Sequence, residues 1–229
     1  MTDSDIAMLH GWCSVDARRN RRKPMDLVVW RGANHSDARW HREDLQRRQV
    51  AKGSVLCSAW RRTLHLLQRP HIVRWWGGEA ERPRSLAETR RKYLPRVLAE
   101  ERVTPYIAML GDRPLGYAQS YVAMGSGDGW WEDVTDPGVR GIDQSLADEH
   151  DLGRGWGTRL VRTLAEQLFR DPSVTRIQTD PHPDNGRAIR CYEKAGFRAV
   201  REIVTPDGPA LYMVCDRPSP RVEPPSGPR

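Results

Sequence analysis

The sequence predicts one α+β domain built on a mixed, mostly antiparallel sheet flanked by helices. Residues 105–124 contain two short strands around the turn "GDRP", which is the pattern of a hairpin. Residues 139–197 alternate strand, helix, strand and helix, and residues 199–214 form a second hairpin around "PDGP". Hairpins on both sides of such an alternation are typical of an α+β fold rather than of a purely parallel α/β sheet.

The first third of the chain has weaker patterns. We expect a short helix over residues 5–12, a short strand within "MDLVVWRG", an exposed helix over residues 36–53 and a weakly amphipathic helix over residues 55–68. These elements differ from the rest of the chain in composition, so the segment is expected to be an insertion or an appended element.

Positive charge is concentrated in residues 13–68. The chain has a formal net charge of +7, from 37 Lys and Arg against 30 Asp and Glu. Residues 13–68 hold 13 of the basic and 5 of the acidic residues, which leaves 24 basic and 25 acidic residues elsewhere. Because no recognised nucleic-acid-binding motif is present, we expect a solvated basic insertion and do not expect nucleic acid as a partner.

Downstream of this insertion the helices have clear boundaries. "SLAETRRKYLPRVLAE" predicts a helix that begins with a capping box, with Ser85 at the cap and Glu88 three residues later. Residues 158–171 carry leucines at every fourth position, which gives that helix one apolar face. The helix within residues 185–197 ends at Gly196, a residue typical of helix C-termini.

These patterns divide the chain into four parts. We expect residues 1–12 to be the first helix of the domain, residues 13–68 a basic insertion, and residues 69–216 the folded core. The tail of residues 217–229 is rich in proline and is expected to be disordered.

Several protein classes are excluded by composition. No apolar run approaches the roughly 20 residues that a membrane helix needs, and the acidic N-terminus is unlike a secretory signal. The four cysteines are scattered and form no CxxC pair, so neither a metal site nor a disulfide framework is expected. We expect a cytoplasmic protein that is a monomer or a weak dimer and does not engage a membrane.

A glycine-rich connection precedes the helix of residues 158–171. In "LGRGWGTRL", Gly153, Gly155 and Gly157 would let backbone N–H groups turn toward an anion at the positive end of the helix. Taken alone, this pattern also fits a simple tight connection between a strand and a helix. It lacks the features of a Walker loop or a dinucleotide fingerprint.

The pair of segments "GRGWGTRL" and "NGRAIRCYEKAGF" resembles the GCN5-related N-acetyltransferase (GNAT) superfamily. The resemblance implies a GNAT fold and acetyl-CoA as cosubstrate, with Asn185 on the pantetheine arm and Tyr192 protonating the departing thiolate. It implies that backbone amides of the first segment hold the CoA pyrophosphate: Gly153, Arg154, Gly155, Gly157 and Thr158. Leu152 departs from the Gln or Arg usual in the family.

Residues 69–216 further resemble the type Ib group of aminoglycoside 6′-N-acetyltransferases, through "GYAQSYVAMGSGDGWW", "TDPGVRGIDQSLA" and "VTPDGPALYMV" among other segments. "MTDSDIAMLHGW" resembles that family's first helix. The family's first strand is not found before this helix, and "DLVVW" is a candidate replacement. The resemblance implies an antibiotic-resistance enzyme that acetylates the 6′ amine of aminoglycosides.

The chemistry of such an acceptor agrees with the residues available. A polycationic sugar calls for several converging carboxylates and for flat aromatic surfaces. The candidate carboxylates are Asp128, Asp143, Asp180 and Asp207, and the candidate aromatic surfaces are Trp76, Tyr93, Trp130 and Trp131. Alternative interpretations remain at this stage: Asp136 and Asp207 both lie in turn sequences, and the two tryptophans could be a half-buried hydrophobic pair.

The resemblance also implies individual roles. Asp143 would be the general base, Asp180 would orient the 6′ amine and Asp128 would anchor another ring. Backbone N–H groups of "GIDQS", at Ile142 and Gln144, would polarise the thioester carbonyl.

Two positions bear on specificity through the same resemblance. Ser145 favours gentamicin over amikacin as acceptor. Trp130 and Asp207 keep the residue types of ordinary family members, so no fluoroquinolone acetylation is expected.

Two alternatives stay open. One is acetylation of another polyamine or of a protein amine by the same fold. The other is a nucleic-acid-binding role of the basic insertion.

Overall fold

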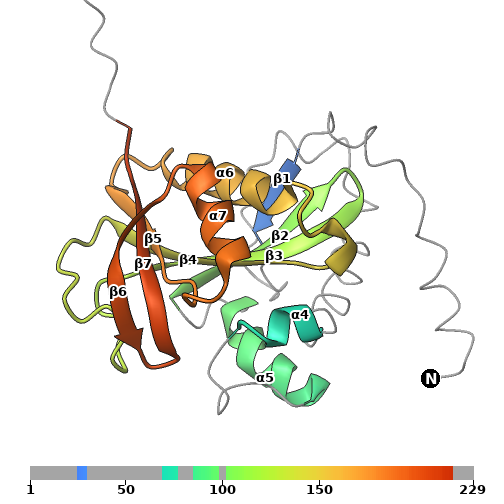
Figure 1. Cartoon of the computed structure of the whole chain (residues 1–229), viewed down its shortest axis with the longest axis horizontal. Coiled ribbons are helices and arrows are strands. Elements are labelled where there is room, and N and C mark those ends of the chain that lie inside the picture. Colours follow the sequence, from blue (N-terminus) through green and yellow to red (C-terminus); the bar gives the residue numbers. More distant parts are fainter. Residues whose placement is uncertain (1–24, 30–68, 77–84, 98–101, 219–229) are drawn as a thin grey trace, which may run out of the picture.

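The computed structural model describes residues 25–29, 69–76, 85–97 and 102–218 (Figure 1). The described strands are β1 (Met25–Val29), β2 (Val103–Leu110), β3 (Arg113–Val122), β4 (Val139–Leu146), β5 (Arg176–Thr179), β6 (Arg198–Thr205) and β7 (Gly208–Asp216). The described helices are α4 (Pro70–Val73), α5 (Leu86–Val97), the 3-10 turn η2 (Glu149–Asp151), α6 (Trp156–Leu168) and α7 (Gly186–Ala195).

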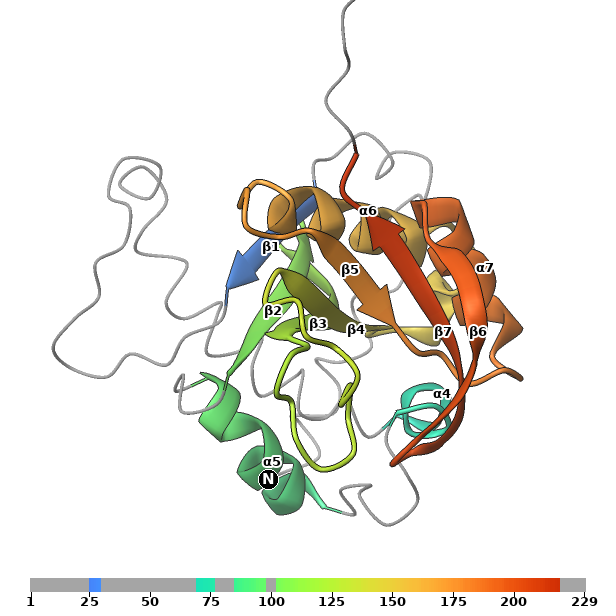
Figure 2. The same cartoon turned by 90° about the vertical axis from the view of Figure 1, so that its left-hand side faces the viewer.

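The described strands form one sheet in the order β1-β2-β3-β4-β5-β7-β6. Every neighbouring pair is antiparallel except β4 and β5, which run parallel. Figures 1 and 2 show α6 and α7 on one face of the sheet, with α4 and α5 on the opposite side. The expectation of an α+β fold on a mixed, mostly antiparallel sheet is therefore confirmed.

Strand β1 comes from the basic segment. Met25–Val29 pairs antiparallel with Tyr106–Leu110 at the edge of the sheet. Met25 is buried against the main core, so the strand expected in "MDLVVWRG" is confirmed and this part of residues 13–68 belongs to the domain. The helices expected over residues 5–12, 36–53 and 55–68 lie outside the described residues.

The main core lies between the sheet and helices α6 and α7. The apolar face of α6 is buried through Leu160, Val161 and Leu164, which pack with Ile142 and Met213 from the sheet. Burying a side chain of this size contributes about 1.5–3 kcal/mol to stability relative to leaving it exposed. The leucine spacing predicted this face correctly, although Leu168 is only partly buried at its end.

Helix α5 covers the other side of the sheet. Its first turn is capped as predicted, because the backbone N–H of Glu88 donates to Ser85 Oγ at 3.1 Å. Tyr93 on α5 is buried in a second, smaller cluster with Ile72 from α4 and Tyr117 from β3. This cluster fixes α4 and α5 against the strands that carry the acceptor side of the site described below.

Both hairpin turns are shorter than the sequence patterns suggest. The β2–β3 turn is Gly111 and Asp112 alone, and Gly111 has the positive φ of 63° that glycine accommodates without strain. Pro114 lies within β3, opposite Met109 at a register shift, where a ladder can accommodate a residue without an N–H. The expected four-residue turn "GDRP" is therefore wrong, because Arg113 and Pro114 belong to strand β3.

The C-terminal boundary also differs from the expected one. Arg217, expected to open the tail, is anchored beside the end of α6. Its backbone N–H donates to Thr175 O at 3.0 Å, and its guanidinium donates to Val174 O at 2.7 Å and Phe169 O at 2.8 Å. The folded domain therefore includes this residue.

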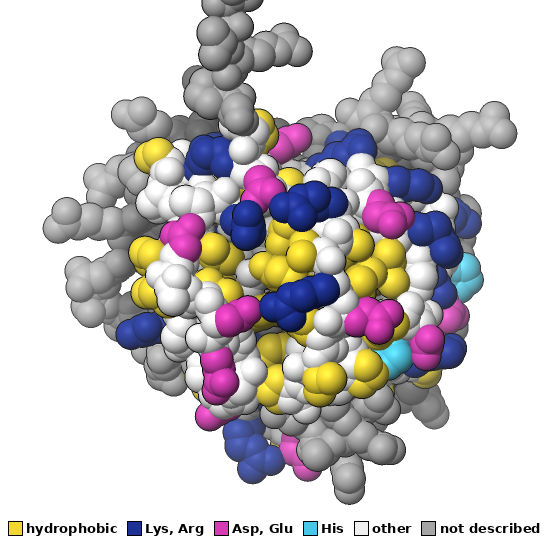
Figure 3. Space-filling model, turned by 60° about the vertical axis from the view of Figure 1, so that its left-hand side comes forward, with side chains coloured by type: hydrophobic (Ala, Val, Ile, Leu, Met, Phe, Trp, Pro, Cys, Tyr) yellow, Lys and Arg dark blue, Asp and Glu magenta, His cyan; other side chains and the backbone are white. Residues whose placement is uncertain are grey.

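The surface of the described domain has mixed charge. On the face seen in Figure 3, Lys and Arg side chains are interspersed with Asp and Glu. Arg176 and Arg198 both pair with Asp216. This agrees with the near-neutral count outside residues 13–68. Within the described ranges, no helix is long and apolar enough to cross a membrane.

We predict that Gly141→Ala destabilises the domain. A Cβ at this position would lie 2.2 Å from Cζ of Tyr121, whose ring covers Gly141, so the ring would have to move. Overpacking of this kind costs about 1–3 kcal/mol. Urea denaturation measures the loss, with Ser145→Ala on the same strand as the control that should stay near the parent. Equal midpoints for the two variants would contradict the prediction.

Candidate functional site

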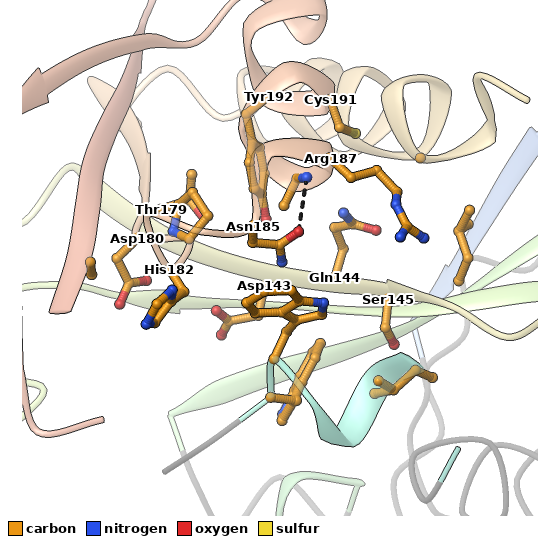
Figure 4. Close-up of a pocket in the computed structure, with 18 of the residues that line it drawn as sticks. Asp143, Gln144, Ser145, Thr179, Asp180, His182, Asn185, Arg187, Cys191 and Tyr192 are labelled. Carbon is orange, nitrogen blue, oxygen red and sulfur yellow. Dashed lines mark hydrogen bonds between the residues drawn. The ribbon is translucent and has the colours of Figure 1, made fainter. Parts of the chain in front are cut away.

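A cavity of about 920 Å³ opens where β4 and β5 separate. Its walls come from the ends of β4 and β5, the glycine loop before α6, the first turns of α7, helix α4 and the tip of the β6–β7 hairpin. Segments far apart in the sequence therefore meet around one space, which Figure 4 shows from inside.

The separation of β4 and β5 is the main feature of this cavity. The two strands pair only from Val139 to Gly141, although β4 continues to Leu146. The backbone carbonyl of Val139 accepts from Ala123 N, next to the end of β3. The backbone carbonyl of Leu146 points to the opposite edge of β4 and accepts from the His71 ring. Backbone groups alternate along a strand, so those of Ile142 and Gln144 lie on the β5 side of β4. The pair Gly141–Gln178 already uses the Ile142 N–H, so the Gln144 N–H is the one left at the gap.

Side chains alternate along the same stretch of β4. In Figure 4, Gln144 extends toward α7, whereas Asp143 and Ser145 extend toward α4. One short strand therefore supplies groups to both sides of the sheet at the cavity.

The glycine loop presents backbone N–H groups to the cavity. Gly153 and Gly155 have φ values of 73° and 85°, and space is open around both. Gly155 is the N-cap of α6 and offers no side-chain acceptor, so the first N–H groups of the helix are left for a ligand. This arrangement fits a phosphate group at a helix N-terminus.

An ion pair fixes the base of this loop. Asp151, a buried residue just before the loop, accepts from the Arg113 guanidinium at 2.7 and 3.3 Å. Asp148 caps the preceding turn by accepting from the backbone N–H of His150 at 3.0 Å. The loop therefore starts from a backbone held to the beginning of β3.

Helix α7 places two predicted groups in the cavity. Asn185 caps the helix, its side-chain oxygen accepting from Ala188 N at 3.2 Å (Figure 4). Tyr192, 5% exposed, lies further along the helix and reaches the cavity. Burial raises the pKa of its hydroxyl well above the usual value, despite a hydrogen bond with Thr179, so the hydroxyl keeps its proton. Burial likewise raises the pKa of the neighbouring Cys191 thiol.

Two carboxylates dominate the side facing α4. Gln119 Nε2 donates to Asp143 Oδ2 at 2.7 Å. Burial raises the pKa of Asp143, and the Gln119 hydrogen bond and the charge of Arg96 oppose this rise. Burial and the nearby charges of Asp143 and Asp207 raise the pKa of Asp180 to about 8.

Most of the predicted site residues meet at the cavity. Those that line it are Trp76, Trp130, Asp143, Gln144, Ser145, Gly153, Gly155, Gly157, Thr158, Asp180, Asn185, Tyr192 and Asp207. Five others do not line it: Tyr93, Asp128, Trp131, Ile142 and Arg154. Ile142 is fully buried in the core and Arg154 is exposed, so for these two only the backbone is available to a ligand there.

Trp131 and Tyr93, expected as sugar-binding surfaces, are buried instead. Trp131 is 7% exposed, donates from Nε1 to Tyr121 Oη at 3.0 Å and packs on Tyr212. Its φ of 53°, rare for a bulky residue, turns the ring inward while Trp130 faces the cavity. Tyr93 is 2% exposed against Tyr117.

Asp128, expected to anchor a sugar ring, is exposed in the glycine-rich loop. Its φ of 53° is of the left-handed kind that short polar side chains tolerate in turns. Asp136, in contrast, is the turn residue that one interpretation suggested. It accepts from Gly138 N at 2.7 Å and from Thr175 Oγ1 at 2.6 Å.

Several cavity residues were missed from the sequence. Gln119 and Tyr121 line the cavity from β3, and Trp75 contacts His182 across it with ring centroids 5.8 Å apart. The alternation of "YAQSY" places Tyr117, Gln119 and Tyr121 on one face, and this signal could have identified them. Across the described part of the chain, no group of His, Cys, Asp or Glu side chains is arranged to hold a metal ion.

Comparison with known proteins agrees with this geometry. The family model described as "Acetyltransferase (GNAT) domain" matches residues 63–205. The chain belongs to this family of acetyltransferases.

Within the family, its relatives include aminoglycoside acetyltransferases. The chain is 68% identical over 151 residues to the aminoglycoside N(6′)-acetyltransferase type 1 of Klebsiella pneumoniae, covering 66% of this chain and 75% of that protein.

Solved structures give the same result. An AAC(6′)-Ib complex with ribostamycin and coenzyme A is 53% identical, with a TM-score of 0.68, over 84% of this chain and 93% of that one. An AAC(6′)-Ib complex with paromomycin and acetyl-CoA is 52% identical, with a TM-score of 0.66 and the same coverage.

The neighbouring tryptophans should respond differently to truncation. We predict that Trp131→Ala costs about 3–5 kcal/mol of stability, because it leaves a cavity in the cluster of Trp131 with Val139 and Ala123. Trp130→Ala removes a half-exposed ring and should cost far less. Thermal unfolding of both variants measures the difference, and similar losses for the two would contradict the assignment of Trp131 as the anchor.

Proposed function

We propose that this protein transfers the acetyl group of acetyl-CoA to the 6′ amine of aminoglycoside antibiotics and so confers resistance to them. The observation that carries the proposal is the position of Asp143 and Gln144 on opposite sides of β4, at the point where β5 separates from it. The relationship to aminoglycoside N(6′)-acetyltransferases, some of them solved with an aminoglycoside and coenzyme A, supports it.

Acetyl-CoA fits the α6–α7 side of the cavity. The free N–H groups at the start of α6 suit the pyrophosphate, and Asn185 at the start of α7 suits the pantetheine arm. Gln144 Oε1 is buried without a hydrogen-bond partner among the described residues, which suits an acceptor for a ligand N–H. The Gln144 N–H lies at the gap, where it would polarise the thioester carbonyl.

The cationic acceptor fits the opposite side. Asp143, Asp180 and Asp207 supply carboxylates, and Trp76 and Trp130 supply aromatic faces for the sugar rings and their ammonium groups. Asp180 orients the 6′ amine. Ser145 lines this side, and its small side chain leaves the space in which we expect gentamicin to be preferred over amikacin.

The reaction proceeds by direct attack. The 6′ ammonium gives a proton to Asp143, directly or through water, and the free amine attacks the thioester carbonyl carbon. The carbon–nitrogen bond forms, the carbon–sulfur bond breaks, and the CoA sulfur leaves with the electron pair. Tyr192, whose raised pKa keeps its hydroxyl protonated, donates a proton to that sulfur. The nitrogen then loses its remaining extra proton, which passes through water to the Tyr192 phenolate, and Asp143 releases the first proton to solvent.

The first test replaces the proposed base. Asp143→Asn should lower kcat/KM for kanamycin acetylation by about 10²–10⁴-fold, as expected for the loss of a general base. CoA release measures the rate, with gentamicin and amikacin as further acceptors, and Asp184→Asn on an exposed loop is the control. Absence of acetyl transfer by the parent chain to any aminoglycoside would refute the proposal.

Binding of the acceptor should depend on pH through Asp180. With its pKa at about 8, this carboxyl is mostly neutral below pH 8 in the free protein, whereas the bound cation favours the carboxylate. Binding therefore releases a proton, and affinity should rise with pH between 6 and 8 by up to about tenfold per unit for one coupled proton.

Calorimetry of kanamycin binding at several pH values measures this dependence. Asp180→Asn should bind more weakly at pH 8 and show a flatter pH profile than the parent. An identical slope in parent and variant would assign the proton to another group.

A further inference from the structure

The side chain of Gln119 connects Asp143 to helix α5. Gln119 Oε1 accepts from Arg96 Nη1 at 2.7 Å and from Tyr117 Oη at 2.8 Å. Its Nε2 donates to Asp143 Oδ2 at 2.7 Å. Because both donors use the same oxygen, the amide cannot rotate by 180° without losing all three hydrogen bonds.

The groups around this amide are packed in place. Gln119 is 7% exposed and Tyr117 is 2% exposed. The Arg96 guanidinium lies 4.8 Å from the ring centre of Tyr93, which in turn meets Tyr117 edge-on at 5.8 Å. The buried Tyr93 therefore supports both donors to Gln119.

The charges that face Asp143 make Arg96 significant. The titratable groups that contribute on this side come from β3, the end of β5, α7 and the β6–β7 turn: Tyr117, Tyr121, Asp180, Tyr192 and Asp207. These are phenols and carboxylic acids. Basic side chains also line the cavity: His71 in α4, Arg74 at the C-cap of α4, Lys92 from α5 and His182 after β5. Of the basic groups, Arg96 on α5 is the one whose charge lowers the pKa of Asp143.

We propose that Arg96 and Gln119 are positioning residues for Asp143, fixing Oδ2 so that Oδ1 is presented to the acceptor amine. Among the described residues, Oδ1 makes no hydrogen bond, so it is the oxygen that can accept the proton. This role rests on the proposed function, in which Asp143 is the base. Helix α5 thereby acts on the reaction without contacting the reacting atoms.

Kinetics with three variants test the role. Gln119→Leu and Arg96→Met should each lower kcat by about 10- to 100-fold, as misplacement of a base does, with KM for acetyl-CoA unchanged. Both should move the ascending limb of the pH–rate profile to higher pH, because each removes a group that favours the carboxylate. Arg96→Lys keeps the charge and should retain most of the pH profile.

A double-mutant cycle tests whether the two residues act together. The combined Gln119→Leu, Arg96→Met variant should lose much less activity than the product of the single losses, since both act through one hydrogen-bond chain. Fully multiplicative losses would overturn the shared role.

A second measurement does not depend on activity. The Asp143 carboxyl carbon, followed by ¹³C NMR, should titrate at higher pH in Gln119→Leu and in Arg96→Met than in the parent. Unchanged titration in variants that keep the parent's circular dichroism would overturn the inference. If the parent acetylates no aminoglycoside, the proposed function fails, while this titration still decides whether Arg96 and Gln119 act on Asp143.

Discussion

The early end of the parallel pairing between β4 and β5 is the constraint on which the site depends. Beyond Gly141 no residue of β4 has a pairing partner on β5, because β5 ends at Thr179 while β4 continues to Leu146. Unpaired backbone groups inside a fold need partners. The gap therefore favours a ligand that brings its own donors and acceptors, and a thioester with its amide-containing arm has them.

The same gap divides the chemistry between two faces of one strand. Asp143 and Ser145 face α4, whereas Gln144 faces α7 (Figure 4). A donor bound along α6 and α7 can thus meet an acceptor held on the other side only through the opening between β4 and β5. Two elements away from this opening hold side chains that line it. Arg96 of α5 donates to Gln119, and Trp131 of the glycine-rich loop donates to Tyr121.

The sequence predicted the folded part of the chain well because its signals were local. The glycines at 153 and 155, the capping box at Ser85 and the helix start at Asn185 each determine backbone conformation within a few residues. It failed where long-range packing decides, as for Trp131 and Tyr93, since a sequence does not show which of two aromatic residues will turn inward. Arg96 gave no signal for the same reason: its partner Gln119 lies 23 positions away.

The central claim is that the gap between β4 and β5 binds the acetyl thioester. Amide chemical shifts of a ¹⁵N-labelled sample, titrated with acetyl-CoA, test it most directly. The account predicts large, saturable shifts at Ile142 and Gln144 together with those of the glycine loop, and small shifts on the exposed strand β6. Saturable binding that shifts the glycine loop but leaves both β4 amides unchanged would contradict it.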